Sequence, residues 1–170
     1  TSGVALRVID DKRIGFTSTT SFEREKEMLD RAGSLAPFGS EAFFNFPEPT
    51  EYPTVDIFDP AVLKISQSSM VETGQSLIER LLDEWPDLLC DARIGWGTGR
   101  GRIMNSAGID QAYEQTSYYC SLGVQLIRGT DMLNIWTGFS SSHVLDENEL
   151  DRLLQTVRRS LRWSENIVKA

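Results

Sequence analysis

The sequence predicts a single mixed α+β domain in which helices cover one face of a mainly antiparallel sheet. The chain has 170 residues, of which 40% are hydrophobic. A chain of this size and composition can bury a core without disulfides or metal. Its β-rich runs follow one another closely, which favours antiparallel pairing, and segments with helical periodicity lie between and after them.

The first two β-rich runs predict a hairpin. They span residues 3–9 and 13–18 and are joined by a charged turn at 10–12, where Asp side chains can bond to the nearby backbone. Thr20 and Glu23 then have the spacing of a capping box, which predicts the start of a helix. The apolar residues of its expected buried face are Phe22, Met28, Leu29 and Ala32.

A long ordered loop and a second helix are expected next. Prolines and phenylalanines interrupt every regular pattern between residues 37 and 60. Ser69 and Glu72 form a second capping-box pair, and apolar residues then recur at helical spacing as far as Pro86. This apolar face comprises Val71, Gly74, Leu77, Ile78, Leu81, Leu82 and Trp85.

The second half of the chain predicts an antiparallel meander followed by a long helix. The β-rich runs are residues 88–96, 102–105, 111–128 and 132–139, with glycine-containing turn signals at 97–99 and 129–130. Asp146 and Glu149 form a capping pair, and Leu145 and Leu150 have the spacing of a hydrophobic staple. The apolar face of this helix comprises Leu150, Leu153, Leu154, Val157, Leu161 and Ile167.

Charge and hydropathy exclude two classes of partner. The formal net charge of -8 repels a phosphate backbone, so we expect no direct binding of nucleic acid. No stretch approaches the roughly 20 apolar residues that span a bilayer, so we expect a cytoplasmic protein without membrane contact. The first residue is Thr1, and a strand is expected from Gly3 onward, which suggests a piece of a longer protein.

Residues with nucleophilic or metal-binding side chains are few. Cys90 and Cys120 lie far apart in apolar segments, and His143 is the single histidine. A zinc site generally needs several imidazole or thiolate ligands close together, so we assign no metal, cofactor or catalytic residue in this chain. A thiol hydrolase that pairs Cys120 with His143 is a weaker hypothesis, because neither thiol is expected at a helix N-terminus.

Alternating glycines between residues 95 and 101 do not have the spacing of a phosphate-binding loop, and a strand rather than a helix is expected after them. We interpret them as a flexible hairpin tip or a bulge. The carboxylates are interpreted as a solvated surface on predicted helices. They are Glu23, Glu25, Glu27, Glu72, Glu79, Asp83 and Glu84.

Two motifs resemble a known family. Residues 3–9, a charged turn, and Gly-Phe-Thr-Ser-Thr at 15–19 resemble the opening element of the TldD/PmbA family. Asn105-Ser106-Ala107-Gly108, which also reads as a tight turn, is similar to that family's Asn-Ser-x-Gly, and a Thr-containing strand and a closing helix follow it here. The resemblance is strongest over residues 3–35 and 102–169 and implies the N-terminal domain of a longer protein.

The family was named for a suggested role in modulating DNA gyrase, and it is a metallopeptidase family that forms a two-subunit assembly and processes peptides. Its catalytic motif, His-Glu-x-x-x-His, has no counterpart in this sequence. The resemblance therefore implies zinc for the full-length protein and none for this chain. Either the catalytic domain lies outside residues 1–170, or the parent belongs to a branch that lacks the motif and acts as a partner subunit.

These observations lead to two main hypotheses. The first is a non-catalytic N-terminal domain of a TldD/PmbA-like peptidase that helps to assemble subunits and shape access to the active site. Its partners would be a second copy or a paralogous subunit, with peptide bound through the full-length protein. The second is a free-standing protein-interaction module without peptidase activity. Phe43-Phe44-Asn45-Phe46 is the candidate contact surface, unless this loop folds onto the domain's own core.

Overall fold

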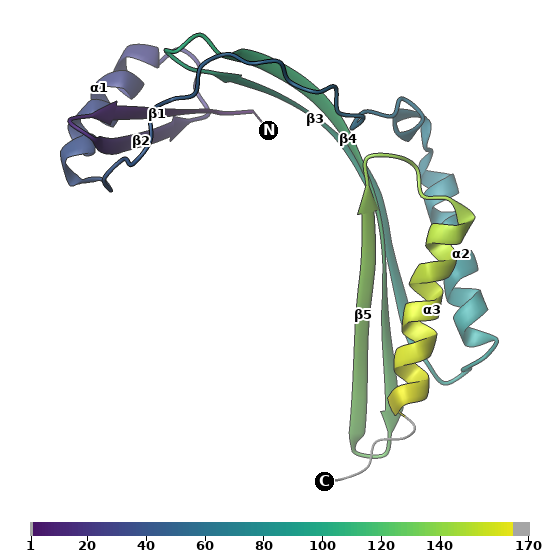
Figure 1. The fold of residues 1–170 in the computed structure, drawn as a ribbon. Coiled ribbons are helices and arrows are strands. Elements are labelled where there is room, and N and C mark those ends of the chain that lie inside the picture. Colours follow the sequence, from purple (N-terminus) through teal and green to yellow (C-terminus); the bar gives the residue numbers. More distant parts are fainter. Residues whose placement is uncertain (1, 165–170) are drawn as a thin grey trace. The chain divides into compact units, whose positions relative to one another are not determined.

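The computed structural model describes residues 2–164 and confirms the α+β class, with three α-helices and two antiparallel sheets (Figure 1). Close contacts divide the chain into two compact units. Unit 1 comprises Thr1–Thr50 and Asn105–Ile109, and unit 2 comprises Glu51–Met104 and Asp110–Ala170. No helix in the described part of the chain is long and apolar enough to cross a membrane.

In unit 1 the predicted hairpin is confirmed. Strands β1 (Val4–Asp10) and β2 (Arg13–Thr19) pair antiparallel. Asp11 and Lys12 have φ angles of 44° and 59°, the left-handed conformation that a two-residue hairpin turn requires at both positions. Helix α1 (Glu25–Leu35) packs against this hairpin.

Gly15 permits an unusually close approach of α1 to β2. A Cβ atom at this position would lie 1.8 Å from the carbonyl oxygen of Ala32. Because that oxygen belongs to the helix backbone, it cannot move aside as a flexible side chain could. The glycine of the Gly-Phe-Thr-Ser-Thr motif therefore has a packing role between strand and helix.

The prediction for the start of α1 is wrong. The helix begins at Glu25 after Arg24, whose side chain makes no capping bond. Thr19 Oγ1 instead accepts a hydrogen bond from the Ser21 backbone amide at 3.1 Å, which holds this segment in a turn. Met28 and Ala32, one helical turn apart, are buried as predicted, whereas the predicted core residues Phe22 and Leu29 are exposed.

The long loop after α1 is confirmed over most of its length. It contains a short 3-10 helix, η1 (Ala36–Phe38), and one isolated bridge between Arg13 and Glu41. A second 3-10 helix, η2 (Val62–Lys64), follows it in unit 2.

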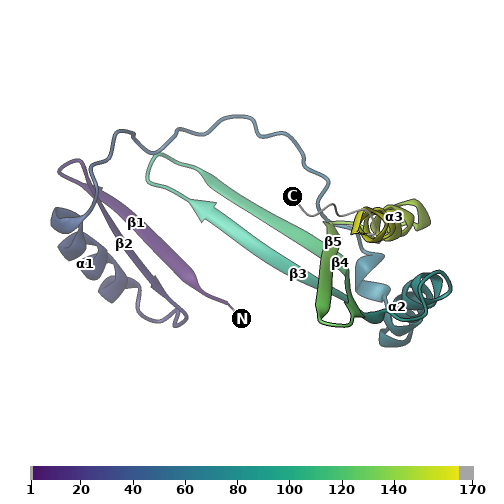
Figure 2. The same cartoon turned by 90° about the horizontal axis from the view of Figure 1, so that it is seen from below.

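Unit 2 contains the predicted antiparallel meander, with three strands instead of the four predicted runs. Its strands are β3 (Leu89–Met104), β4 (Asp110–Arg128) and β5 (Asp131–Ser141), in the order β3-β4-β5. Helices α2 (Gln67–Leu82) and α3 (Glu147–Ser164) lie side by side on the same face of this sheet (Figures 1 and 2).

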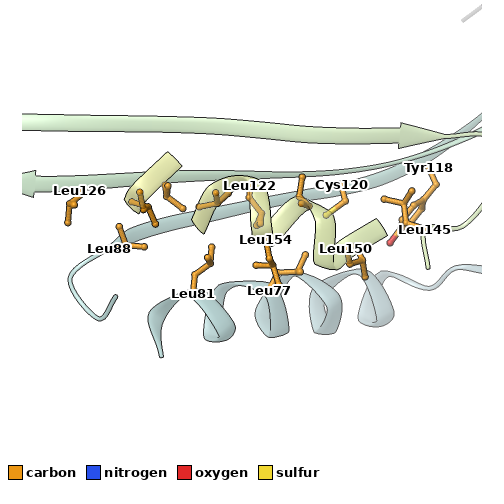
Figure 3. Packing of buried hydrophobic residues seen from close by; sticks show 14 of the residues in the cluster. Leu77, Leu81, Leu88, Tyr118, Cys120, Leu122, Leu126, Leu145, Leu150 and Leu154 are labelled. Carbon is orange, nitrogen blue, oxygen red and sulfur yellow. The ribbon is translucent and has the colours of Figure 1, made fainter. Parts of the chain in front are cut away.

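The core of unit 2 lies between this sheet and its two helices (Figure 3). Alternate residues of β4 point into it, and α3 contributes the leucine and valine face that its helical spacing predicts. Ile167, the last residue of the predicted face, lies outside the described residues. The buried members are Val62, Leu77, Leu81, Leu88, Tyr118, Cys120, Leu122, Val124, Leu126, Leu145, Leu150, Leu153, Leu154, Val157 and Leu161.

The two helices differ in how well their starts were predicted. At α3 the capping box is confirmed, because the backbone amides of Asp146 and Glu149 each donate to the other's carboxylate at 2.9 Å. Helix α2 begins one turn earlier than predicted. Its cap is Ser66, whose Oγ accepts from the Ser69 backbone amide at 3.1 Å.

The turn predicted at residues 97–99 is wrong. Strand β3 continues through it, paired with β4 from Leu89↔Gln125 to Met104↔Asp110. The glycines at 95, 97, 99 and 101 are two residues apart, so all four lie on one face of the strand. The predicted strands 88–96 and 102–105 are therefore one continuous strand.

Residues Val71 and Leu81 provide a test of the packing on α2. Both belong to the apolar face predicted from sequence, but Leu81 is fully buried whereas Val71 is 51% exposed. We expect Leu81→Ala to lower the free energy of unfolding by about 2–5 kcal/mol, because it leaves a cavity. Val71→Ala should change it by less than about 0.5 kcal/mol. Urea unfolding of both variants measures this, and equal losses would contradict the packing described.

Candidate interaction surfaces

The aromatic loop of unit 1 is held at both ends by hydrogen bonds to the rest of that unit. Near its start, the Ile14 backbone amide donates to the Ser40 carbonyl at 3.0 Å. Near its end, Asn105 Nδ2 donates to the Pro47 carbonyl at 2.8 Å. Residues 43–46 lie between these two anchors, so the backbone that presents the phenylalanines is fixed at both sides.

Exposure distinguishes the two interpretations of this loop. Phe43 is 87% exposed and Phe44 is 47% exposed, so these rings do not fold onto the core of the unit. Phe46 is partly buried. The candidate contact surface predicted from sequence is thus present, with Phe43 and Phe44 as its outward members.

Unit 1 exposes more large apolar side chains than it buries. Its buried apolar residues in the described part of the chain are Met28, Ala32, Ala36 and Ile109. Its exposed ones are Val4, Phe16, Phe22, Leu29, Leu35, Phe38, Phe43 and Phe44. Small units with so little core are marginally stable alone.

The predicted turn at residues 105–108 is confirmed, and the Asn105 side chain holds its backbone in place. Asn105 Oδ1 accepts hydrogen bonds from the backbone amides of Ala107 and Ile109, both at 3.0 Å. Gly108 has a φ of 104°, which favours glycine. Because the Asn105 side chain also binds Pro47, this motif both closes the connection from β3 to β4 and anchors the aromatic loop.

Two tyrosine rings fill the space above the glycines of β3. Gly95 pairs with Tyr119 and Gly101 pairs with Tyr113 across the strands. A Cβ atom at Gly95 would lie 2.5 Å from the Tyr119 hydroxyl, and one at Gly101 would lie 2.4 Å from Cζ of Tyr113. Glycine in β3 therefore provides room for aromatic side chains of β4, an arrangement that compensates for the poor strand propensity of glycine.

Within the described residues of unit 2, no helix covers the face of the β3-β4-β5 sheet opposite α2 and α3. Side chains that alternate with the core residues project from this open face. Its large, exposed apolar members are Leu89, Tyr113, Tyr119, Ile127, Met132 and Trp136. The open face is a second candidate interaction surface, on unit 2.

Neither cysteine has the environment of a nucleophile. Cys120 is fully buried in the core, and burial raises the pKa of its thiol to about 11. The pKa of Cys90 is also raised, first by burial and then by the neighbouring Asp91 carboxylate. Since the thiolate is the reactive form, the structure disfavours the thiol hydrolase hypothesis.

His143 lies near carboxylates. Its Nε2 is 3.8 Å from Asp56 Oδ2, and its Nδ1 is 3.8 Å from Asp59 Oδ2. Within residues 2–164, no group of three or more His, Cys, Asp or Glu side chains is placed to hold a metal ion. One imidazole and two carboxylates at these separations do not fit the zinc that the family implies.

Comparisons with known proteins agree with the fold and with the first of the two motifs. Residues 1–36 match the family model for domain 1 of the PmbA/TldA metallopeptidases. The crystal structure of TldE from Thermococcus kodakarensis superposes with a TM-score of 0.63 and 22% identity, covering 89% of this chain and 36% of that one.

A second crystal structure, from Thermotoga maritima, is of a protein named for a suggested role as modulator of a DNA gyrase. It superposes with a TM-score of 0.66 and 14% identity, over 90% of this chain and 36% of that one. No curated protein matches. The present chain thus spans about a third of the length of the structures it matches.

The fold is that of the corresponding part of TldE-like proteins. The resemblance to the TldD/PmbA family, inferred from the strand-turn-strand motif at residues 3–19, is confirmed by the family model that covers it.

The raised pKa of Cys120 predicts low reactivity. With a pKa of about 11, about one thiol in a thousand is ionised at pH 8. In a Cys90→Ser variant we expect iodoacetamide to alkylate Cys120 at least a hundredfold more slowly than free cysteine at this pH, and faster as pH rises. Mass spectrometry over time measures the rate. Alkylation as fast as that of free cysteine would show that Cys120 is accessible and activated.

Proposed function

We propose that this chain is a non-catalytic first domain of a TldD/PmbA-like, peptide-processing metallopeptidase. In this proposal it contributes to subunit assembly and to access to an active site formed elsewhere. The family-model match over residues 1–36 and the fold shared with TldE support it. Zinc and the peptide substrate would be bound by another part of the assembly, because the described residues contain no fitting set of zinc ligands.

The observation that carries the assembly role is the outward placement of Phe43 and Phe44 on a loop anchored at both ends. Aromatic side chains on a fixed backbone lose little conformational entropy on binding, and they dominate interface energies. Complete burial of one phenylalanine stabilises a complex by about 1.5–3 kcal/mol. Two such rings therefore suffice to decide whether subunits associate at micromolar concentration.

The partner in this proposal is a second copy of the chain or a paralogous subunit of similar fold. A free-standing interaction module without peptidase activity would use the same surface to bind an unrelated protein. The two functions differ in the partner, because only the first predicts association between TldD/PmbA-like chains.

Replacement of both outward phenylalanines tests the assembly role. We expect the chain to self-associate and Phe43→Ser with Phe44→Ser to weaken association at least about tenfold, since each lost ring removes apolar burial. Sedimentation velocity over a concentration series measures this. Val55→Ser, an exposed apolar residue of unit 2, is the matched control and should leave association unchanged.

Thermal unfolding separates an interface effect from a folding effect. At a protein concentration at which the wild-type chain is monomeric, the double variant should unfold at the wild-type midpoint, because its substituted side chains are exposed. Loss of folding would show that the loop belongs to the core of unit 1. A wild-type chain that stays monomeric at all concentrations would contradict self-association through this loop and favour an unrelated partner.

A further inference from the structure

The open face of the sheet in unit 2 contains a hollow of about 430 Å³. One row of three residues crosses the strands at this point. Asp91 on β3 pairs with Gly123 on β4, which pairs with Trp136 on β5. A carboxylate and an indole therefore flank a residue that has no side chain.

The adjacent row forms the other wall of the hollow. Leu89, Gln125 and Asn134 occupy it, again one from each strand. Gln125 Nε2 donates a hydrogen bond to Asn134 Oδ1 at 2.9 Å. The hollow is thus bounded by an apolar side chain, two amides, a carboxylate and an aromatic ring.

Gly123 is the reason that the hollow is open. A Cβ atom at this position would lie 2.3 Å from Asp91 Oδ1, so any larger residue would displace the carboxylate and occupy the space. Trp136 leans along its own strand, since its Cη2 atom is 3.5 Å from the position of a Cβ on Gly138. The Trp136 side chain is 69% exposed, which is unusual for a tryptophan.

The Asp91 carboxylate keeps one oxygen directed over the hollow. Its Oδ2 lies 3.3 Å from Nε of Arg93 on the same strand, whereas Oδ1 is the oxygen closest to Gly123. Both side chains of this ion pair are mostly exposed, and exposed pairs contribute little to stability. Asp91 can therefore accept a second cationic partner with little loss of stability.

The chemistry of the walls selects among possible occupants. An acidic group would be repelled by Asp91 and by the net charge of -8. A purely apolar group would remove water from a carboxylate without replacing its hydrogen bonds, which is unfavourable. A guanidinium can interact with both kinds of group. It donates hydrogen bonds in its plane to carboxylate and amide oxygens, and its face stacks on an indole.

We propose that this hollow binds a single arginine side chain of a partner polypeptide, with its guanidinium between Asp91 and Trp136. Gln125 and Asn134 also line the hollow, and an amide oxygen can accept a further hydrogen bond. Lysine fits less well, because a point-like ammonium does not stack as a planar group does. The inference does not depend on the proposed peptidase connection, since it uses unit 2 and none of the residues of the aromatic loop.

The test uses the whole chain labelled with fluorotryptophan and two short peptides, acetyl-Ser-Arg-Ser-amide and the same peptide with citrulline in place of arginine. Citrulline has nearly the same shape but no charge. The chain has four tryptophans, and a Trp136→Phe variant identifies the fluorine signal of Trp136. We expect the arginine peptide to shift this signal saturably at millimolar concentration and the citrulline peptide to bind at least about tenfold more weakly.

Three variants locate the binding. Asp91→Asn should weaken binding of the arginine peptide at least about tenfold. Binding to the wild-type chain should also weaken at high salt, because salt screens the attraction between exposed charges. Gly123→Ala should also weaken it, because its Cβ displaces the carboxylate. Gly99→Ala is the matched control on the same face of the sheet, where a Cβ makes only ordinary contact with Gln115, and it should bind as wild type does.

Several results would overturn the proposal. They are a Trp136 signal that does not respond to the arginine peptide, equal responses to arginine and citrulline, or an Asp91→Asn variant that binds normally. The spread of the four fluorine signals reports folding in the same samples, and Gly123→Ala provides an independent test if Asp91→Asn alters the fold. Loss of subunit association in the Phe43 and Phe44 variant would leave these outcomes unchanged.

Discussion

The alternation of side chains along β4 is the constraint on which unit 2 depends. Cys120, Leu122 and Val124 point into the core beneath α2 and α3, while Ser121 and Gly123 point to the open face. Because the period of a strand is two residues, a shift of one position would exchange these faces and expose the core. This arrangement concentrates the stabilising apolar burial on one side of the sheet, and no helix of unit 2 covers the other side in the described residues.

Local signals in the sequence predicted the cap of α3 and the first hairpin turn, but not the starts of α1 and α2. The reciprocal cap of Asp146 and Glu149 and the turn at Asp11 and Lys12 each depend on residues a few positions apart. The glycine run of β3 was misread because glycine suits a turn and equally suits a strand that must accommodate a ring from its neighbour. Tyr113 and Tyr119, whose rings occupy the space over these glycines, lie on β4. The pairing of β3 with β4 is therefore needed to identify the glycine run as part of a strand.

The candidate surfaces likewise depend partly on nearby residues and partly on residues that are distant in the sequence. Composition alone indicated an aromatic loop, but contacts with distant residues decide which rings face outward. The hollow could not be predicted at all, because Asp91, Gly123 and Trp136 become neighbours only through the register of three strands.

Unit 2 carries its own core, whereas unit 1 buries little apolar surface and is therefore expected to be the less stable of the two units. Hydrogen exchange of the isolated chain tests it most directly. We predict that amides of β4 and α3 exchange only through global unfolding, and that amides of α1 and the β1-β2 hairpin exchange through a smaller opening, at least about tenfold faster. Equal protection in the two units would contradict the claim.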